Sequence, residues 1–313
     1  MCGSFFYMDA RTSYPKSYTS PEELVRLLEE RGLAIEDVER AQRYLQYIGY
    51  YRLSACTHPF LASPKTDHRY KPNVSFGMVI RLYRFDKKLR LLIFNELEKI
   101  EVAVRAAIVD VGCQLLESPF WITEPQHFSD QSKFEQTLRL IEQELKRSKE
   151  DFIEHFKQCY AEKYPPAWML AEILPFGAIT AIYGNLKKKH VQKKISQTFG
   201  LQIAPFKSWL TSIYLKRNAC CHHARVRNKQ DSITPMLPDT TSHPWISLPV
   251  EKSRLYIVLC IVKYFLNIIS PQNDMKDKLQ ILLTDFPEID TAMMGFPTGW
   301  ELETLWNFEN RQN

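Results

Sequence analysis

The sequence predicts an all-α protein, and three observations support this. Between Pro72 and Pro119, 46 residues contain no proline, and apolar residues from Leu82 to Leu115 recur there at every third or fourth position. Ser20-Pro21-Glu22-Glu23 forms a capping box with proline at the first helical position. No segment shows the period-two alternation of apolar and polar residues that is typical of a half-buried strand.

The expected elements follow from apolar spacing and from start and stop residues. Ser132 and Glu135 indicate a second capping box, opening a helix that reaches about Tyr160. Gly200 is expected to end one helix, and Pro205 to lie in the first turn of the next. Four prolines predict a loop over 230–250. The stripe between Pro72 and Pro119 predicts a long helix, and further helices are expected at 21–31, 35–48, 167–173, 176–188, 190–199, 205–223, 251–269 and 273–284.

Length and composition limit the class of protein. A chain of 313 residues that is 45% hydrophobic can bury a sizeable core. We expect one helical domain over 20–306, flanked by an extension over 1–19 and a tail over 307–313. Its expected parts are a helical part at 20–164, a basic segment at 165–230 and closing helices at 231–306.

The sequence predicts a cytoplasmic protein with no membrane partner. No apolar run reaches the roughly 18 residues that a membrane helix needs. The first residues lack the basic, apolar and small-residue regions of a signal peptide. Seven cysteines without framework spacing indicate reduced thiols.

Charge is unevenly distributed along the chain. The 58 residues from Ile173 to Gln230 contain 11 Lys or Arg and no Asp or Glu, whereas the rest carries 30 basic and 36 acidic residues. Such a block favours a polyanion partner, nucleic acid first. For Lys187, Lys188 and Lys189 alone, a solvated face is the alternative.

The stretch KRNACCHHARVRN, Lys216 to Asn228, combines cysteines, histidines and arginines. Four consecutive residues on a helix point about 100° apart, so Cys220 to His223 cannot surround one tetrahedral ion. No second ligand pair stands elsewhere in the chain. We therefore expect no metal and no cofactor, and the cysteines are expected to be small core residues.

Arg217 shares the helical stripe of Phe206, Leu210 and Ile213. A guanidinium on an apolar face is costly unless an anion meets it, which indicates a carboxylate, a phosphate or a wet subunit interface. His222 follows five residues later, about 140° around and about 7.5 Å along a regular helix. The two side chains therefore converge only if the helix distorts or two copies meet. Together they would suffice for metal-free RNA transesterification, since His transfers protons and Arg stabilises phosphoryl charge.

The run Arg217-Asn218-Ala219-Cys220-Cys221-His222 resembles the R-x-x-x-x-H signature of HEPN ribonucleases. With the following residues to Asn228 it is similar to the Abi-like family of AbiD/AbiF-type abortive-infection proteins. Other segments resemble the same family over roughly residues 20 to 306: Tyr50–Ser54, Leu82–Arg90, Ile100–Arg105, Leu174–Gly177 and Met294–Pro297. Cys221 departs from the expected alanine, and Cys56-Thr57-His58 from an aromatic-rich stretch, so we assign no role to His58.

The resemblance implies a HEPN-type helical bundle with additional N-terminal and C-terminal helices, often a homodimer with a composite site. It implies a toxin in phage defence, in some members restrained by a cognate small non-coding RNA. His222 would be the general acid or base, Arg217 would stabilise the phosphorane, and Asn218 would orient the imidazole or contact the phosphate.

Surrounding residues would support this site. Glu101 would hold Arg217, with Arg105 and His223 nearby, although a surface salt-bridge row of Glu98, Glu101 and Arg105 is the alternative. The expected RNA contacts are Lys187, Lys188, Lys189, Lys193, Lys194, Arg225 and Asn228. The leading hypothesis is thus a metal-independent endoribonuclease. A non-catalytic module that holds a partner RNA and a zinc-dependent hydrolase remain alternatives.

Overall fold

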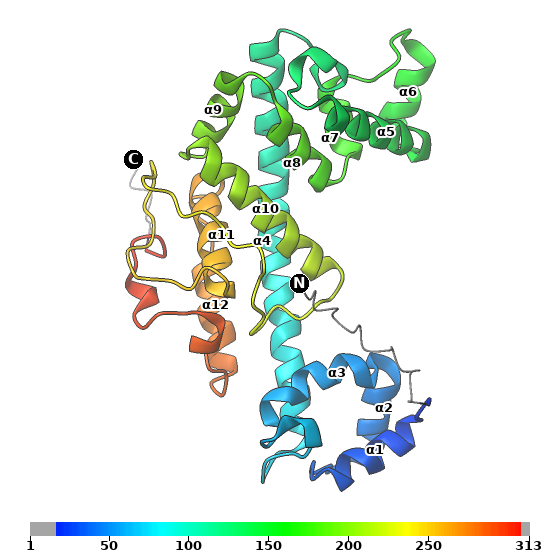
Figure 1. Cartoon of the computed structure of the whole chain (residues 1–313), viewed down its shortest axis with the longest axis vertical. Helices are drawn as coiled ribbons and strands as arrows, with labels where there is room; N and C mark the ends of the chain where they lie inside the picture. Colours follow the sequence, from blue (N-terminus) through cyan, green and yellow to red (C-terminus); the bar gives the residue numbers. More distant parts are fainter. Residues whose placement is uncertain (1–16, 308–313) are drawn as a thin grey trace, which may run out of the picture. The chain divides into compact units, whose positions relative to one another are not determined.

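The computed structural model describes residues 17–307, which divide into two compact units, 17–84 and 85–307 (Figure 1). Within this range there are twelve α-helices and no strand, only isolated bridges such as Leu61–Tyr70 and Phe128–Leu186. The predicted all-α class is confirmed. The expected extension over 1–16 and the tail over 308–313 lie outside the described residues, and the domain boundaries within 20–306 stay a prediction.

The first unit contains α1 (Pro21–Glu30), α2 (Val38–Ile48), α3 (Tyr50–Thr57) and the start of α4 (Phe76–Leu116). The capping box of α1 is confirmed: Glu23 N donates to Ser20 Oγ at 3.2 Å, and Ser20 N donates to Glu23 Oε2 at 2.7 Å. Helix α2 begins three residues later than expected, because Asp37 accepts from the Arg40 N–H at 2.8 Å and caps it.

Helix α4 carries the predicted core stripe. In the second unit its members Phe85, Leu89, Ile93, Leu97 and Ile100 are all at most 1% exposed. Two acidic side chains are buried on the same helix, Asp86 and Glu96. Both need partners at that depth, and both have them.

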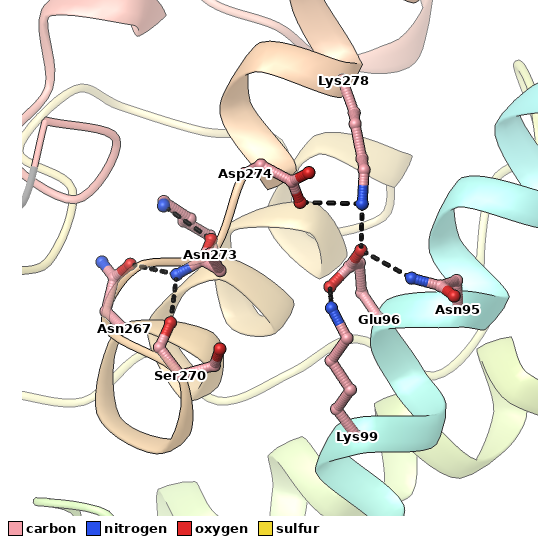
Figure 2. A network of polar contacts seen from close by, with 9 residues as sticks. Asn95, Glu96, Lys99, Asn267, Ser270, Asn273, Asp274 and Lys278 are labelled. Atoms are coloured by element: carbon pink, nitrogen blue, oxygen red, sulfur yellow. Dashed lines mark hydrogen bonds and ion pairs between the residues drawn. The ribbon is translucent and has the colours of Figure 1, made fainter.

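Glu96 ties α4 to α12 (Met275–Asp285) through a polar network (Figure 2). Its carboxylate accepts from Lys99 Nζ at 2.7 Å and from Asn95 Nδ2 at 2.9 Å, and it lies 3.7 Å from Lys278 Nζ. Lys278 also pairs with Asp274 at 2.7 Å. The buried charge is therefore compensated from two helices.

The predicted helix from Ser132 to about Tyr160 is wrong in its cap and in its continuity, because two helices occupy this range. Helix α5 spans Gln131–Arg147, and its cap is Asp130, whose carboxylate accepts from the Lys133 N–H at 3.1 Å. Ser132 therefore lies inside the helix, because a better cap stands two residues earlier. Helix α6 (Asp151–Cys159) is separate, since the backbone is extended at Ser148 and Glu150.

The remaining helices lie close to their expected ranges. They are α7 (Ala167–Ile173), α8 (Phe176–Asn185), α9 (Lys189–Thr198), α10 (Ile203–Cys221) and α11 (Leu255–Ile269). As expected, Gly200 follows α9, with a φ of 63°. No helix among residues 17–307 is long and apolar enough to cross a membrane.

Aromatic packing fixes α10, which crosses α4 in the view of Figure 1. Phe206 stacks on Phe199 at 5.2 Å, and Trp209 meets the edge of Tyr264 of α11 at 5.2 Å. The long loop after α10 is tied back to it, because Trp209 Nε1 donates to the Met236 carbonyl at 2.8 Å. The buried ammonium of Lys216 pairs with Asp231 at 2.8 Å. Helix α10 is thus held along its whole length.

Candidate functional site

The motif residues lie at the C-terminal end of α10. The helix ends at Cys221, two residues earlier than expected, and His222 forms the cap with its N–H on the Asn218 carbonyl at 2.9 Å. His223 has a φ of 55°, and its N–H donates to the Cys220 carbonyl at 3.1 Å. Ala224 N donates to the Ala219 carbonyl at 2.8 Å. These bonds form a Schellman motif in which His223 occupies the left-handed position that glycine usually takes.

Arg217 has the anion partner that its position on the apolar stripe of α10 requires. Its Nε donates to Glu101 Oε2 at 3.2 Å, and its side chain is 35% exposed. The other carboxylate oxygen, Glu101 Oε1, accepts from Arg105 Nη2 at 2.6 Å. One carboxylate of α4 thus links two arginines.

Arg105 extends this chain of contacts to α7. It donates to the carbonyl oxygens of Ala171 and of Leu174, the latter at 2.6 Å, and so satisfies backbone acceptors at the end of that helix. The side chains of Glu101 and Arg105 are each 14% exposed. They are therefore not part of a solvated surface row, whereas Glu98 is exposed. The contacts run from α7 through Arg105 and Glu101 to Arg217.

Arg217 lines two neighbouring cavities. The first, about 420 Å³, is also lined by Glu98, Glu101, Trp168 and Glu172. The second, about 730 Å³, is lined by residues that include Lys133, Gly177, Lys207, Tyr214 and Asn218. Arg217 is thus open to ligands on two sides, and its neighbour Asn218 faces the second cavity. His222 lines neither cavity.

Gly177 allows α8 to approach α10 closely at the second cavity. A Cβ at this position would lie 2.7 Å from the Tyr214 ring, one turn before Arg217 on α10. Glycine is therefore needed for the packing that shapes this wall.

The two histidines are exposed at the end of α10. Because α10 is regular through Cys221, the angular separation of about 140° between Arg217 and His222 remains. A single copy does not bring His222 into the cavities that Arg217 lines. The distortion that would let the pair converge within one chain is absent from α10.

The buried cysteine of the motif does not offer a thiolate at neutral pH. Cys220 is buried, and its burial raises the pKa of the thiol to about 12. Cys221 is half-buried. Between residues 17 and 307, no three His, Cys, Asp or Glu side chains are placed to share a metal ion.

Asp86 is a site residue that the sequence reasoning missed. Its Oδ1 accepts the N–H groups of Val226 at 3.1 Å and Arg227 at 2.8 Å, and its Oδ2 pairs with Arg90. Burial raises the pKa of Asp86, and the Arg227 N–H and the Arg90 charge oppose that rise. Asp86 therefore fixes the backbone that directly follows the motif.

A signal for Asp86 was present in the sequence. It stands four residues after Leu82 and three before Leu89, on the apolar stripe of α4. A charge on an apolar stripe requires a partner, as it does for Arg217.

The basic block separates into exposed and buried parts. The expected RNA contacts Lys187, Lys188, Lys189, Lys193 and Lys194 are all exposed, before and along α9. Lys188 and Lys189 begin α9, where positive charge opposes the helix dipole, and Lys189 Nζ also donates to Gln192 Oε1 at 3.0 Å.

The other basic positions are less accessible. Lys216 and Arg227 are buried, and Arg225 is half-buried. Asn228 is half-buried with a φ of 51°. Its amide fits contacts to the Met293 carbonyl at 3.2 Å and to Arg227 at 2.7 Å. The exposed lysines of α9 are therefore better placed for an external polyanion than the residues after the motif.

The chain is thus an all-α protein with an arginine–histidine pair at the end of one helix and exposed lysines before and along another. A model of the Abi-like protein family matches residues 43–228, and the chain belongs to that family. The match includes the whole motif. Family membership associates the chain with abortive-infection phage defence. Searches of curated proteins and of solved structures give no match.

Proposed function

We propose that this protein is a metal-independent HEPN-type endoribonuclease, a toxin-like effector that cleaves RNA by 2′-OH transesterification. The observation that carries the proposal is the pair of motif side chains at the end of α10. Arg217 is held by Glu101 at 3.2 Å yet 35% exposed, and His222 is exposed at the helix cap. An oriented guanidinium and an accessible imidazole are the two groups that this chemistry needs.

In the proposed reaction the ribose 2′-OH attacks the adjacent phosphorus while one His222 imidazole accepts its proton. The bond from phosphorus to the 5′-oxygen breaks, and that oxygen takes up a proton from the imidazolium, which restores the neutral imidazole. Arg217 donates hydrogen bonds to the phosphoryl oxygens as negative charge develops on them. Asn218, on the cavity wall beside Arg217, contacts the phosphate. The products are a 2′,3′-cyclic phosphate and a 5′-OH.

The proposal predicts that RNA cleavage persists in EDTA. Because the nucleophile belongs to the RNA, a 2′-deoxy linkage at the cut site is expected to resist cleavage. The measurement is end-group analysis of a labelled RNA after incubation with the protein and chelator. Products with 5′-phosphate ends, or activity that disappears with EDTA, would contradict this mechanism and favour the zinc-dependent alternative.

We further propose a homodimer in which Arg217 of one copy works with His222 of the other, since one α10 holds them about 140° apart. An apolar surface beside Arg217 supports this: Val102 is 57% and Trp168 50% exposed, and both line the first cavity. Exposed apolar groups at one site are typical of an interface.

Mixing two inactive variants tests the composite site. Arg217→Ala and His222→Ala are each expected to be inactive, and their mixture is expected to regain part of the cleavage rate through heterodimers. Val102→Glu is expected to give monomers in light scattering, whereas Ile281→Glu, an equally exposed apolar site on α12 that lines neither cavity, should leave the dimer intact. A monomer with full activity would rule out the composite site.

The exposed lysines of α9 are proposed to grip RNA phosphates. Replacing Lys187, Lys188 and Lys189 by Gln should weaken binding to all sequences alike. The log–log salt slope should become shallower by about 0.7 for each lost phosphate contact. The matched control replaces Lys146, Lys149 and Lys157 by Gln, because it removes the same charge from exposed positions on and between α5 and α6. Equal slopes for the two triple variants would mean that the α9 lysines are only solvated.

A non-catalytic module that holds a small non-coding RNA is the second candidate. Its support is the contact chain from α7 through Arg105 and Glu101, which also gives Arg217 a purely structural use. Cleavage lost in His222→Ala with RNA binding kept would favour the nuclease. Purification from cells without added nuclease, followed by sequencing of the retained RNA, would identify a cognate RNA.

A further inference from the structure

The first unit presents two tyrosine rings to solvent on neighbouring helices. Tyr47, near the end of α2, is 80% exposed, and Tyr51, at the second position of α3, is 92% exposed. Only the turn at Gly49, with a φ of 88°, separates the two helices. Aromatic rings at this exposure contribute little to the core. Their faces are accessible to a ligand.

Arginines share the helical face of Tyr47. Arg40 and Arg43 are exposed on α2, seven and four residues before Tyr47, and so lie on the same helical face. Arg84 of α4 reaches that face, since its Nη2 donates to Tyr44 Oη at 2.7 Å. The Arg40 guanidinium lies over the Tyr44 ring at 5.8 Å from the centroid.

Two guanidinium groups thus converge on one tyrosine. The hydrogen bond from Arg84 and the charges of Arg84 and Arg40 lower the pKa of Tyr44. Like charges this close repel one another, and an anion between them would relieve the repulsion. The acidic neighbour on α2, Glu39, is 3.8 Å from Arg43 and largely solvated.

The charge of the surrounding sequence has the same sign. Residues 40–84 contain eight Lys or Arg and a single acidic residue, Asp67, whereas Glu36, Asp37 and Glu39 stand at the start of α2. This segment precedes the basic block that carries the motif and is separate from it. The second half of α2 and the residues that follow it therefore fit a polyanion.

We propose that α2 and the start of α3 form a binding surface for single-stranded RNA, with Tyr47 and Tyr51 as stacking platforms and Arg40, Arg43 and Arg84 as phosphate contacts. Exposed rings combined with cationic side chains are how proteins bind unpaired nucleic acid without reading its sequence. The surface goes beyond the proposed function, because none of these residues belongs to the cleavage motif.

The test uses the full chain with His222→Ala, so that the RNA stays intact, and a labelled oligouridylate of about 12 nucleotides. Fluorescence anisotropy is expected to show affinity weakened about five-fold or more for each ring in Tyr47→Ala and Tyr51→Ala. Tyr47→Trp and Tyr51→Trp should bind at least as tightly as the parent, since indole stacks on bases. An RNA duplex of the same length should show a much smaller loss, because its bases are not free to stack.

This design separates a loss of RNA binding from a loss of folding. Both tyrosines are almost fully exposed, so circular dichroism melts of the alanine variants should match the parent. Equal affinity of the alanine and tryptophan variants for oligouridylate would overturn the proposal. The readout is binding alone, so the proposal holds if the tyrosine losses appear even where the parent protein cleaves no RNA.

Discussion

Replacing His222 by alanine is expected to slow RNA cleavage by about 10²–10⁴-fold, the usual contribution of a general acid or base. Folding stability is expected to stay within about 0.5 kcal/mol of the parent, because the side chain is exposed. The cap of α10 depends on the backbone N–H of His222 on the Asn218 carbonyl, which alanine keeps. Cleavage rates at saturating RNA and a denaturant titration measure the two quantities.

His223→Gly is the matched control for this variant. His223 is also exposed, but it takes the left-handed position of the Schellman motif, which glycine adopts without strain. We expect the control to be as stable as the parent or slightly more so, with a cleavage rate within a few-fold. If His223→Gly lost activity as His222→Ala does, the second histidine would act on the RNA in addition to ending α10.

The guanidinium is tested by Arg217→Lys, which keeps a positive charge near Glu101 but loses the planar fork. A catalytic Arg217 predicts strong loss of cleavage in a folded protein. A large fall in stability with cleavage retained would mean that Arg217 serves the contact between α4 and α10 alone.

Much of the fold follows from the sequence because local signals and packing agree. The stripe of α4 combines regular apolar spacing with a proline-free stretch, the capping box of α1 combines a start residue with a proline at the first position, and both are present. The anion partner of Arg217 was predictable for a physical reason, since a guanidinium on an apolar stripe cannot be left without one. That the partner is Glu101 depends on how α4 and α10 pack, and here the family resemblance supplied the candidate.

The errors arise where two local signals compete or where the partner is remote. Asp130 and Ser132 can each cap a helix, and spacing alone does not decide between them. Asp86 was missed because its ligands, the N–H groups of Val226 and Arg227, stand about 140 residues later in the chain. Single-sequence reasoning shows that such a charge needs a partner but not which backbone supplies it.

Asp86→Ala is expected to lower the free energy of unfolding by about 3–5 kcal/mol, the usual effect of breaking a buried ion pair from one side. The Asp86 side chain is only 4% and that of Arg90 9% exposed, so alanine would leave the Arg90 charge buried without its carboxylate. It would also leave the N–H groups of Val226 and Arg227 without their acceptor. The midpoint of urea unfolding measures the change.

Lys88→Ala provides the matched control, because it breaks an ion pair with Asp285 in which both side chains are about half exposed. Its expected effect is below about 1 kcal/mol. Asp86→Asn should fall between the two, since its amide oxygen still accepts backbone N–H groups but carries no charge for Arg90. At the site, Asp86→Ala should slow cleavage more than its stability loss explains, because the segment after His222 loses its anchor on α4. Equal destabilisation by Asp86→Ala and Lys88→Ala would mean that α4 does not fix this segment through Asp86.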